Sequence, residues 1–195
     1  MKIVIAAGGT GGHIYPGIAL AQEIRRRETA AEIVFLGSRD GLERELVAQA
    51  GFKLVLIKAR ALMRTLSYKS ISAPFLCLIG FFQSLYILKR VSPKWVVATG
   101  GYVSWPVVLA ARLLRIPIVL LEQNVFPGAV NRLLSRFAKK VYLNFQQTLQ
   151  YLYGEVAGNP VRQEIKEVGR EAARAELQVT LDEKVVLVMG GSQGA

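Results

Sequence analysis

The sequence predicts an α/β fold in which a parallel sheet is covered by helices on both faces. Three features lead to this prediction: short apolar runs alternate with amphipathic segments, glycine-rich loops follow three of the runs, and polar side chains follow another. Strand and helix signals that alternate along a chain indicate parallel pairing with helical crossovers. The chain has 195 residues, of which 52% are hydrophobic. This length accommodates one complete domain and part of a second.

The first strand and the loop after it organise the rest. Residues 2–6 form an apolar run typical of a buried parallel strand. A glycine-rich loop follows at residues 6–17. A helix is expected next, with Pro16 near its first turn and apolar residues at helical spacing from Ile18 to Ile24. Glycines let a backbone approach a ligand closely, and a helix N-terminus offers free N–H groups and positive potential. The segment therefore predicts an anion-binding site.

Two common glycine fingerprints do not fit this loop. A dinucleotide-binding loop requires a glycine where Ile14 stands and an acid after the second strand, where Gly37 stands. A P-loop requires Lys followed by Ser or Thr, but Ile18 follows the last glycine. The loop instead contains His13, the only histidine in the chain. Anion binding combined with proton transfer is the interpretation that this residue favours.

The elements expected further along the chain repeat the same alternation. Residues 40–49 predict a short helix with Leu42, Leu46 and Val47 facing inward. Further strands are expected at residues 33–36, 53–57, 95–98, 118–121 and 140–143, and helices at 107–114, 128–136 and 169–178. A short last element is expected before residue 162, and residues 184–189 predict one more buried strand, with a glycine loop after it. The last strand suggests a second α/β domain that is cut off at its first turn.

Residues 60–90 differ from the rest because their apolar stretch approaches the length of a membrane span. Ser72, Pro74 and Gln83 interrupt it, and it lies between two strands expected in one sheet, so we reject a transmembrane helix. Two interpretations remain open. The segment is a helix that covers the sheet, or its outer face also enters the interface of an anionic membrane beside the flanking cations.

Composition limits the classes of partner and cofactor. The formal net charge of +11 favours anionic partners, but the cations are scattered and no nucleic-acid-binding module is present. Cys77 is the only cysteine, which leaves no disulfide framework or cysteine metal site. No acidic cluster suggests a metal ion, and the N-terminus has no pattern of a secretory signal. We expect neither a metal nor another cofactor.

Two further strand ends carry residues suited to a ligand. The strand at 95–98 leads into Thr99-Gly100-Gly101-Tyr102-Val103-Ser104, a second glycine loop that opens a helix near Pro106. The strand at 118–121 leads directly into Glu122-Gln123-Asn124. Open α/β sheets bind ligands beyond the carboxyl ends of their strands, so these segments are expected beside the first loop.

Five motifs together resemble the MurG family of bacterial glycosyltransferases. They occur in family order as GGTGGHIYPG at residues 8–17, GGYVS at 100–104, EQN at 122–124, GNPVR at 158–162 and GGSQGA at 190–195. The resemblance covers the whole chain and implies a GT-B fold, with two Rossmann-like domains facing each other across a cleft. Residues 1–162 would be the N-terminal acceptor and membrane domain. Residues 163–195 would be a linker and the truncated start of the donor-binding domain.

The resemblance also implies an activity. Members of the family transfer N-acetylglucosamine from UDP-N-acetylglucosamine to undecaprenyl-pyrophosphoryl-N-acetylmuramoyl-pentapeptide in peptidoglycan synthesis. The reaction inverts the anomeric centre without a metal ion, on the cytoplasmic face of the inner membrane, where the enzyme is peripheral. The second domain supplies most donor contacts in this family, so this chain alone is expected to have little or no activity.

Site residues are implied by motif position. His13 would be the general base for the acceptor hydroxyl, because imidazole can accept a proton near neutral pH. The residues implied to bind UDP-N-acetylglucosamine are Thr10, Gly11, Gly12, Asn124, Arg162 and Ser192. Those implied to bind the acceptor are Gly100, Gly101, Tyr102 and Glu122. Two positions depart from the family pattern: Leu121 stands where a histidine is frequent, and Trp105 replaces a small residue.

Other functions are compatible with these residues. Another GT-B enzyme, such as a glycolipid synthase, or a sugar-nucleotide epimerase would use a similar scaffold, but an epimerase needs no acceptor lipid. A non-catalytic module that holds a lipid pyrophosphate at the membrane is an alternative of a different class. A nicotinamide dehydrogenase is disfavoured by Ile14 and Gly37.

Overall fold

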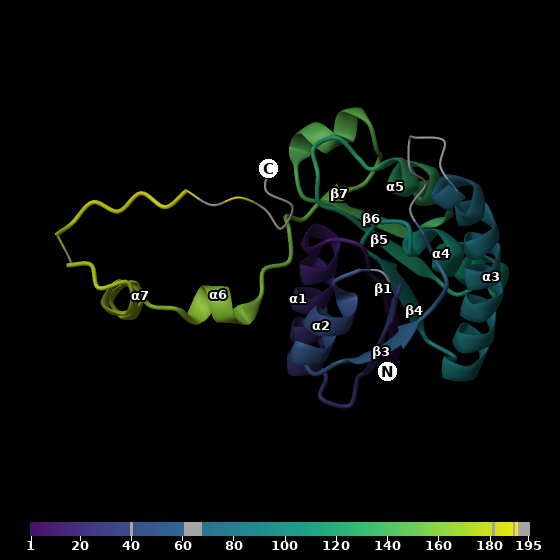
Figure 1. The fold of residues 1–195 in the computed structure, drawn as a ribbon, viewed down its shortest axis with the longest axis horizontal. Helices are drawn as coiled ribbons and strands as arrows, with labels where there is room; N and C mark the ends of the chain where they lie inside the picture. The colour runs from purple at the N-terminus through teal and green to yellow at the C-terminus, as the bar shows by residue number, and fades with distance from the viewer. Residues whose placement is uncertain (40, 61–67, 181, 189, 191–195) are drawn as a thin grey trace.

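The computed structural model describes residues 1–39, 41–60, 68–180, 182–188 and 190, and these contain one seven-stranded parallel sheet (Figure 1). The strands are β1 (Lys2–Ala6), β2 (Glu32–Gly37), β3 (Lys53–Leu56), β4 (Trp95–Ala98), β5 (Ile118–Glu122), β6 (Lys140–Leu143) and β7 (Glu155–Val156). Their order in the sheet is β3-β2-β1-β4-β5-β6-β7. The chain winds outward from β1 to one edge and then outward from β4 to the other. The crevice between β1 and β4 is therefore the topological switch point, where this type of sheet binds ligands.

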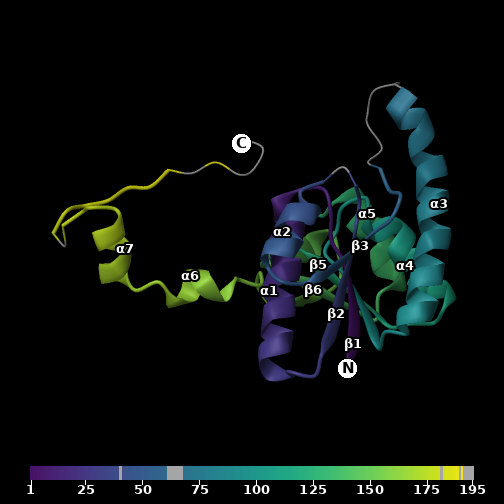
Figure 2. The same ribbon diagram turned by 60° about the horizontal axis from the view of Figure 1, so that its bottom comes forward.

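Helices cover both faces of the sheet, as the sequence predicts (Figure 2). One face carries α1 (Gly11–Arg27) and α2 (Glu43–Gln49), and the other carries α3 (Tyr68–Val91), α4 (Ser104–Leu113) and α5 (Ala129–Leu134). The core is split accordingly. Ile5, Ile14 and Phe35 are buried in the layer under α1 and α2, whereas Leu88 and Val107 belong to the layer under α3 and α4. Short 3-10 turns occur at Ser135–Phe137 and Gln146–Gln150.

The first helix begins earlier than predicted, at Gly11, so that Pro16 lies beyond its first turn. Thr10 is the N-cap in an extended conformation, and Gly11, Gly12 and His13 form the first helical turn. Pro16 lies inside the helix and removes the N–H that would pair with the carbonyl of Gly12. The prediction was wrong because Gly11, Gly12 and Pro16, which are typical of loops, all lie inside this helix. The correction matters for the site, because it places two glycine N–H groups at the helix N-terminus.

The second helix buries a different residue from those predicted. Val47 is buried and Leu46 is half-buried, as expected, but Leu42 is 40% exposed and Glu43 is completely buried. The helix starts at Glu43, and Asp40 lies outside the described residues. Leu42 is only the N-cap residue, so it does not share the inward face. The inward position in the first turn belongs to a carboxylate.

Helix α3 packs with one face only, mainly against α4 on that side of the sheet. Its inner side includes Leu88 and Ser84, both fully buried, and Ser84 Oγ donates to the carbonyl of Gly80 at 2.7 Å. Among the helices of the described residues, α3 alone is long and apolar enough to cross a membrane, and 17% of its segment Pro74–Val91 is buried. It joins β3 to β4 across the sheet, which fits the first of the two interpretations, a covering helix. Ser72 has no described side chain, and residues 61–67 lie outside the described part.

The predicted strand at residues 184–189 is wrong for the part that the structure describes. Residues 184–188 have no regular secondary structure, and Val186 and Val188 are 87% and 89% exposed. A parallel strand forms only beside another strand, and no described strand pairs with this segment. Helices α6 (Gln163–Glu167) and α7 (Arg170–Glu176) precede it, and all three extend away from the sheet (Figure 1). Helix α7 confirms the helix expected there. Residues 191–195 lie outside the described part.

Candidate active site

Two glycine loops meet at the carboxyl ends of β1 and β4. The loop after β1 contains Gly9, with φ of 93°, and the loop after β4 contains Gly100 and Gly101, with φ of 99° and 75°. These left-handed conformations are accessible to glycine at little cost. A Cβ atom at Gly101 would lie 2.7 Å from the carbonyl oxygen of Gly8. The two backbones therefore approach so closely that only glycine fits between them.

His13 lies between the loops and has a defined tautomer when neutral. Its Nδ1 atom is 3.0 Å from the carbonyl oxygen of Thr99, and the ring is half-buried. A carbonyl oxygen only accepts hydrogen bonds, so Nδ1 carries the hydrogen and Nε2 is left with a lone pair. Cβ atoms at Gly100 and Gly101 would lie 3.0 Å from His13 Cε1 and 3.3 Å from Cδ2. The second glycine loop thus encloses the ring of a histidine whose Nε2 can act as a base.

Glu122 is buried and organises the loop after β5. It is 2% exposed, and its Oε1 accepts hydrogen bonds from the backbone N–H and the side-chain amide of Asn124, at 2.9 and 3.0 Å. Its Oε2 accepts from the N–H of Gly128 at 3.1 Å and from Nδ2 of Asn131 at 2.9 Å. Both carboxylate oxygens are thus used inside the protein. The implied contact of Glu122 with the acceptor stays a prediction.

Asn131 is a site residue that the sequence analysis missed. It is 2% exposed in α5, and its Nδ2 also donates to the carbonyl of Leu121 at 3.0 Å. A Cβ atom at Gly100 would lie 3.2 Å from this Nδ2, which places Asn131 directly behind the second glycine loop. Its Oδ1 is buried and has no hydrogen-bond partner among the described residues. Nothing in the sequence around Asn131 distinguishes it from a surface asparagine of a helix.

The remaining implied donor residues are placed as follows. Gly11 and Gly12 start α1, Thr10 caps it, and Asn124 is exposed after β5. Arg162 reaches back to α1, where its guanidinium carbon lies 4.4 Å from the ring centroid of Tyr15. Ser192 lies outside the described residues. All described candidates except Arg162 therefore come from the carboxyl edge of three neighbouring strands.

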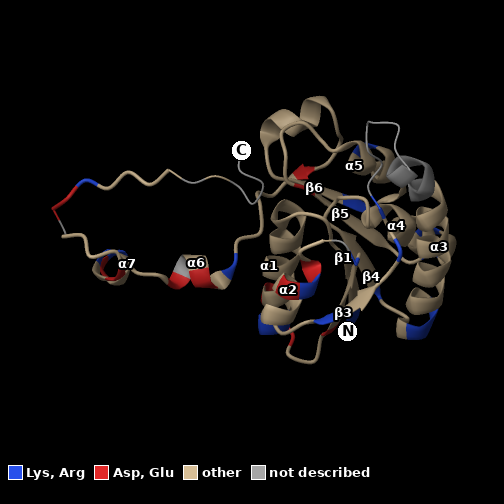
Figure 3. Cartoon of the chain, viewed as in Figure 1, with Lys and Arg blue, Asp and Glu red and all other residues tan. Residues whose placement is uncertain are grey.

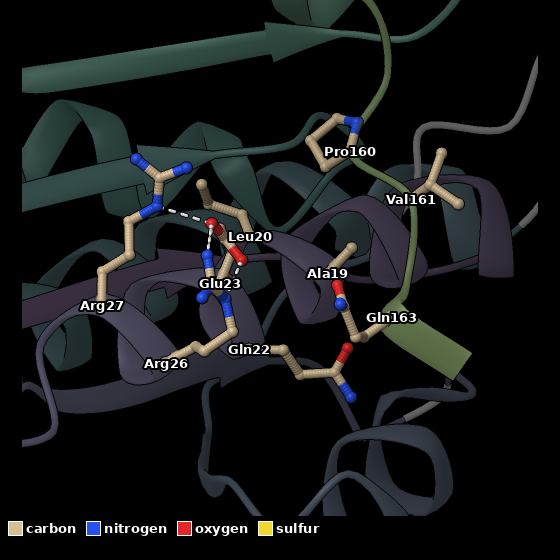
Figure 4. A pocket seen from close by; sticks show the side chains of 9 residues that line it. All are labelled: Ala19, Leu20, Gln22, Glu23, Arg26, Arg27, Pro160, Val161 and Gln163. Carbon is tan, nitrogen blue, oxygen red and sulfur yellow. Dashed lines mark hydrogen bonds and ion pairs between the residues drawn. The ribbon is translucent and has the colours of Figure 1, made fainter. Parts of the chain in front are cut away.

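A nearby hollow is separate from this site. It has a volume of about 410 Å³ and lies between the later turns of α1 and residues 160–163 (Figure 4). Its charged side chains bind one another: Arg26 Nε and Nη2 each donate to a carboxylate oxygen of Glu23 at 2.8 Å. Hydrogen bonds from Arg26 and Arg27 lower the pKa of Glu23 to about 2. None of the predicted site residues lines this hollow.

The chemistry that the site can support is anion binding next to a base. Backbone N–H groups at the start of α1 and the helix dipole favour negative charge. Within the described residues no group of three or more His, Cys, Asp or Glu side chains is arranged to hold a metal ion. The arrangement fits a phosphate-bearing ligand. A hydroxyl group of that ligand, or of a second substrate bound beside it, would lose its proton to His13 Nε2.

Comparison with known proteins identifies the family. The model of the glycosyltransferase family 28 N-terminal domain matches residues 3–143. The chain belongs to glycosyltransferase family 28. Its seven-stranded sheet has the GT-B architecture, and the resemblance to the MurG family is confirmed by relatives and by a solved structure.

Alignments with curated relatives extend over the whole length of this chain. The protein of Caldicellulosiruptor saccharolyticus is 43% identical over 199 residues, which are 100% of this chain and 54% of the relative. The protein of Caldanaerobacter subterraneus is also 43% identical, over 100% of this chain and 55% of the relative. Both are named UDP-N-acetylglucosamine–N-acetylmuramyl-(pentapeptide) pyrophosphoryl-undecaprenol N-acetylglucosamine transferase. The chain spans about half the length of these relatives.

Solved structures agree with the fold. The crystal structure of Acinetobacter baumannii MurG superposes with a TM-score of 0.68 at 29% identity, covering 83% of this chain and 46% of that one. The UDP-GlcNAc 2-epimerase of Neisseria meningitidis has a TM-score of 0.58 at 14% identity, covering 77% and 42%. The epimerase likeness shows the shared fold alone.

Proposed function

We propose that the protein transfers N-acetylglucosamine from UDP-N-acetylglucosamine to a lipid-linked muramoyl-pentapeptide, with inversion at the anomeric carbon. The names of the relatives support the substrates. The observation that carries the proposal is the 3.0 Å hydrogen bond between His13 Nδ1 and the Thr99 carbonyl, because it leaves Nε2 as a base between two anion-binding loops. Residues 1–162 would form the acceptor and membrane domain, and residues 163–195 the linker and the start of the donor domain.

In the proposed reaction His13 Nε2 removes the proton from the acceptor hydroxyl as its oxygen attacks the anomeric carbon. The bond between that carbon and the phosphate oxygen breaks, and UDP leaves with the electron pair. The hydrogen bond to Thr99 holds the imidazole in place and stabilises the imidazolium that forms. The N–H groups of Gly11 and Gly12 would offset the charge of the phosphates.

The implied ligand contacts divide between the two substrates. Thr10, Gly11, Gly12, Asn124, Arg162 and Ser192 would bind the donor, and Gly100, Gly101, Tyr102 and Glu122 would bind the acceptor. The carboxylate of Glu122 also holds Asn124 and Asn131 in place. The donor set is incomplete without the second half of the relatives, so we expect this chain alone to turn over little or no substrate.

We also propose that α3 binds the surface of an anionic membrane and makes the protein peripheral to the cytoplasmic face. Four apolar or aromatic residues spaced three or four apart form one outward stripe: Phe75, Leu78, Phe82 and Tyr86, between 52% and 69% exposed. The helix contains no acidic residue, and Lys89 and Arg90 lie at its C-terminal end (Figure 3). An exposed apolar stripe beside cations is suited to a lipid interface.

Vesicle sedimentation tests the membrane proposal. Replacing Phe75 and Phe82 by Ser should weaken binding to vesicles with anionic lipid by about 100-fold or more, because each aromatic side chain gains about 1.5–3 kcal/mol on burial. Tyr153, which is 93% exposed and outside α3, provides the control variant Tyr153→Ser, with unchanged binding. Equal binding of all three proteins would contradict the role of α3.

Sugar transfer tests the catalytic proposal. Labelled UDP-N-acetylglucosamine and the lipid-linked acceptor would be supplied to this chain alone, and then together with the missing half of the Caldicellulosiruptor relative. We expect transfer only with the second half present, and a loss of about 10²–10⁴-fold on His13→Ala, with membrane binding unchanged. No transfer despite association of the two halves would favour another acceptor or a binding-only role. Conversion of the donor without acceptor would favour an epimerase.

A further inference from the structure

Glu43 is a completely buried carboxylate beneath the first glycine loop. Its Oε1 accepts hydrogen bonds from the N–H and the hydroxyl of Ser38, both at 2.7 Å, and its Oε2 accepts from the N–H of Gly9 at 3.2 Å. No ion pair involves Glu43 among the described residues. A buried carboxylate is costly unless it is fully hydrogen-bonded. These three donors therefore explain how it is tolerated, but they do not explain why it is there.

The hydrogen bonds continue from Glu43 to the second glycine loop. Ser38 Oγ lies 2.7 Å from the hydroxyl oxygen of Tyr102. Ser38 has one hydroxyl hydrogen and donates it to the carboxylate, so Tyr102 must donate to Ser38. A Cβ atom at Gly9 would lie 3.1 Å from the ring of Tyr102, which means that the ring packs on Gly9. These contacts form a closed circuit that joins the two loops. Hydrogen bonds link Gly9, Glu43, Ser38 and Tyr102 in that order, and the ring of Tyr102 packs back on Gly9.

The surrounding glycines leave room for this carboxylate. A Cβ atom at Gly8 would lie 2.7 Å from Glu43 Oε1, and one at Gly37 would lie 2.5 Å from Glu43 Cγ. A Cβ atom at Gly41 would overlap the carboxylate itself. Glycines from two segments, the loop after β1 and the stretch from the end of β2 to α2, therefore line one carboxylate side chain. This packing is independent of the hydrogen bonds and indicates a site built around Glu43.

We propose that Glu43 is a positioning residue of the transferase, which fixes the two glycine loops relative to each other and so holds His13. The link to His13 is short: Tyr102 follows Gly100 and Gly101, which pack on the imidazole ring, and Gly9 lies one residue before the cap of α1. Glu43 acts through Ser38, Tyr102 and Gly9 and does not touch the substrates. This role rests on the proposed function, in which His13 is the base.

The first test measures sugar-transfer kinetics of this chain combined with the half of the Caldicellulosiruptor relative that this chain does not cover. In Glu43→Gln an amide N–H₂ group replaces one carboxylate oxygen and meets a hydrogen-bond donor of Ser38 or Gly9 instead of accepting from it. Tyr102→Phe removes the hydroxyl at the other end of the circuit. We expect each substitution to lower kcat by about 10–100-fold and to change KM for the donor by less than about threefold. The reason is that a small displacement of a catalytic base strongly lowers the rate of proton transfer. Glu45→Gln is the matched control, since Glu45 lies in the same helix and is exposed.

The double variant separates a shared circuit from two independent defects. If Glu43 and Tyr102 act through the same chain of hydrogen bonds, Glu43→Gln combined with Tyr102→Phe should be about as active as the weaker single variant. Losses that multiply would overturn the proposal. A rise in KM with kcat unchanged would do the same, because it would mean that substrate binding rather than positioning of the base is affected.

The second test needs no activity, because His13 is the only histidine in the chain. Imidazole ¹⁵N resonances of the 195-residue chain therefore report one residue. We expect the Nδ1–H tautomer in the wild type and in Glu45→Gln, and a mixture of tautomers in Glu43→Gln and Tyr102→Phe, with circular dichroism showing that the fold is retained. A wild-type spectrum in both variants would overturn the role of Glu43. This result does not depend on whether the protein transfers sugar, so the two proposals can fail separately. If Glu43→Gln does not fold, Tyr102→Phe decides the question.

Discussion

Replacing Gly101 by alanine is the sharpest test of how the two loops fit together. Gly101 has φ of 75°, and its Cβ would lie 2.7 Å from the carbonyl oxygen of Gly8 and 3.3 Å from His13 Cδ2. Ordinary contacts of a Cβ atom begin at 3.4 Å. The oxygen belongs to the backbone and cannot rotate away as a flexible side chain could. Gly101→Ala must therefore strain its own backbone and also push the loops apart.

Gly51 separates these two effects. It has nearly the same φ, 70°, but its Cβ would meet nothing within 4 Å. Gly51→Ala should cost only the left-handed strain of about 1–2 kcal/mol. Gly101→Ala should cost the same strain and in addition about 1–3 kcal/mol for overpacking. Each kcal/mol corresponds to about 2–4 °C in Tm for a chain of this size.

Thermal unfolding of the two variants, followed by circular dichroism, measures the difference. We expect Gly101→Ala to unfold at a clearly lower temperature than Gly51→Ala, and its His13 ¹⁵N resonances to shift, whereas those of Gly51→Ala stay at the wild-type positions. Equal Tm values for the two variants would refute the close approach of the loops. A normal His13 spectrum in Gly101→Ala would refute the enclosure of the ring by the second loop.

Two further substitutions test other parts of the fold. A Cβ at Gly80 in α3 would overlap the carbonyl oxygen of Lys58. Urea unfolding should therefore show that Gly80→Ala destabilises the chain by about 1–3 kcal/mol, although alanine has the higher helix propensity. A stabilised variant would contradict this contact. For Glu23, an NMR titration of its carboxyl carbon should give a pKa of about 2, and Arg26→Gln should raise it. The pKa of Glu23 in the folded chain lies below its ordinary value of 4.5. Its ion pairs therefore stabilise the folded state fully above about pH 4.5, and this stabilisation is lost as the pH falls through 2. A titration near 4.5 in the wild type would rule out the pair.

The strands of this fold could be predicted because parallel strands are buried on both faces. Continuous apolar runs such as Ile3–Ala6 and Val96–Ala98 indicate such strands without any knowledge of their neighbours. Residues 185–188 are equally apolar, yet Val186 is 87% exposed, because a strand also requires a partner strand. Composition reports the tendency to be buried, whereas pairing depends on segments far away in the chain.

The candidate site could be predicted only in part, for a similar reason. His13 was found because a lone histidine in a glycine-rich segment is unusual. Glu43 was missed because a glutamate in a short amphipathic helix indicates the solvent-facing side. Its burial depends on donors from Ser38 and Gly9, which follow two different strands. Asn131 was missed likewise, because its partners Leu121 and Glu122 belong to β5.

The chemistry of His13 ultimately depends on the register between β1 and β4. The carbonyl that sets its tautomer belongs to Thr99, 86 residues further along the chain. Ala6 is aligned with Ala98, and the N–H of Thr99 donates to the carbonyl of Ala6 at 3.1 Å. A shift of β4 by one residue would displace Thr99 by about 3.3 Å and break the bond to Nδ1. The imidazole would then be free to carry its hydrogen on either nitrogen, and Nε2 would no longer be reserved as the base. A residue that sequence alone marks as reactive therefore acquires its defined role from the pairing of two apolar strands.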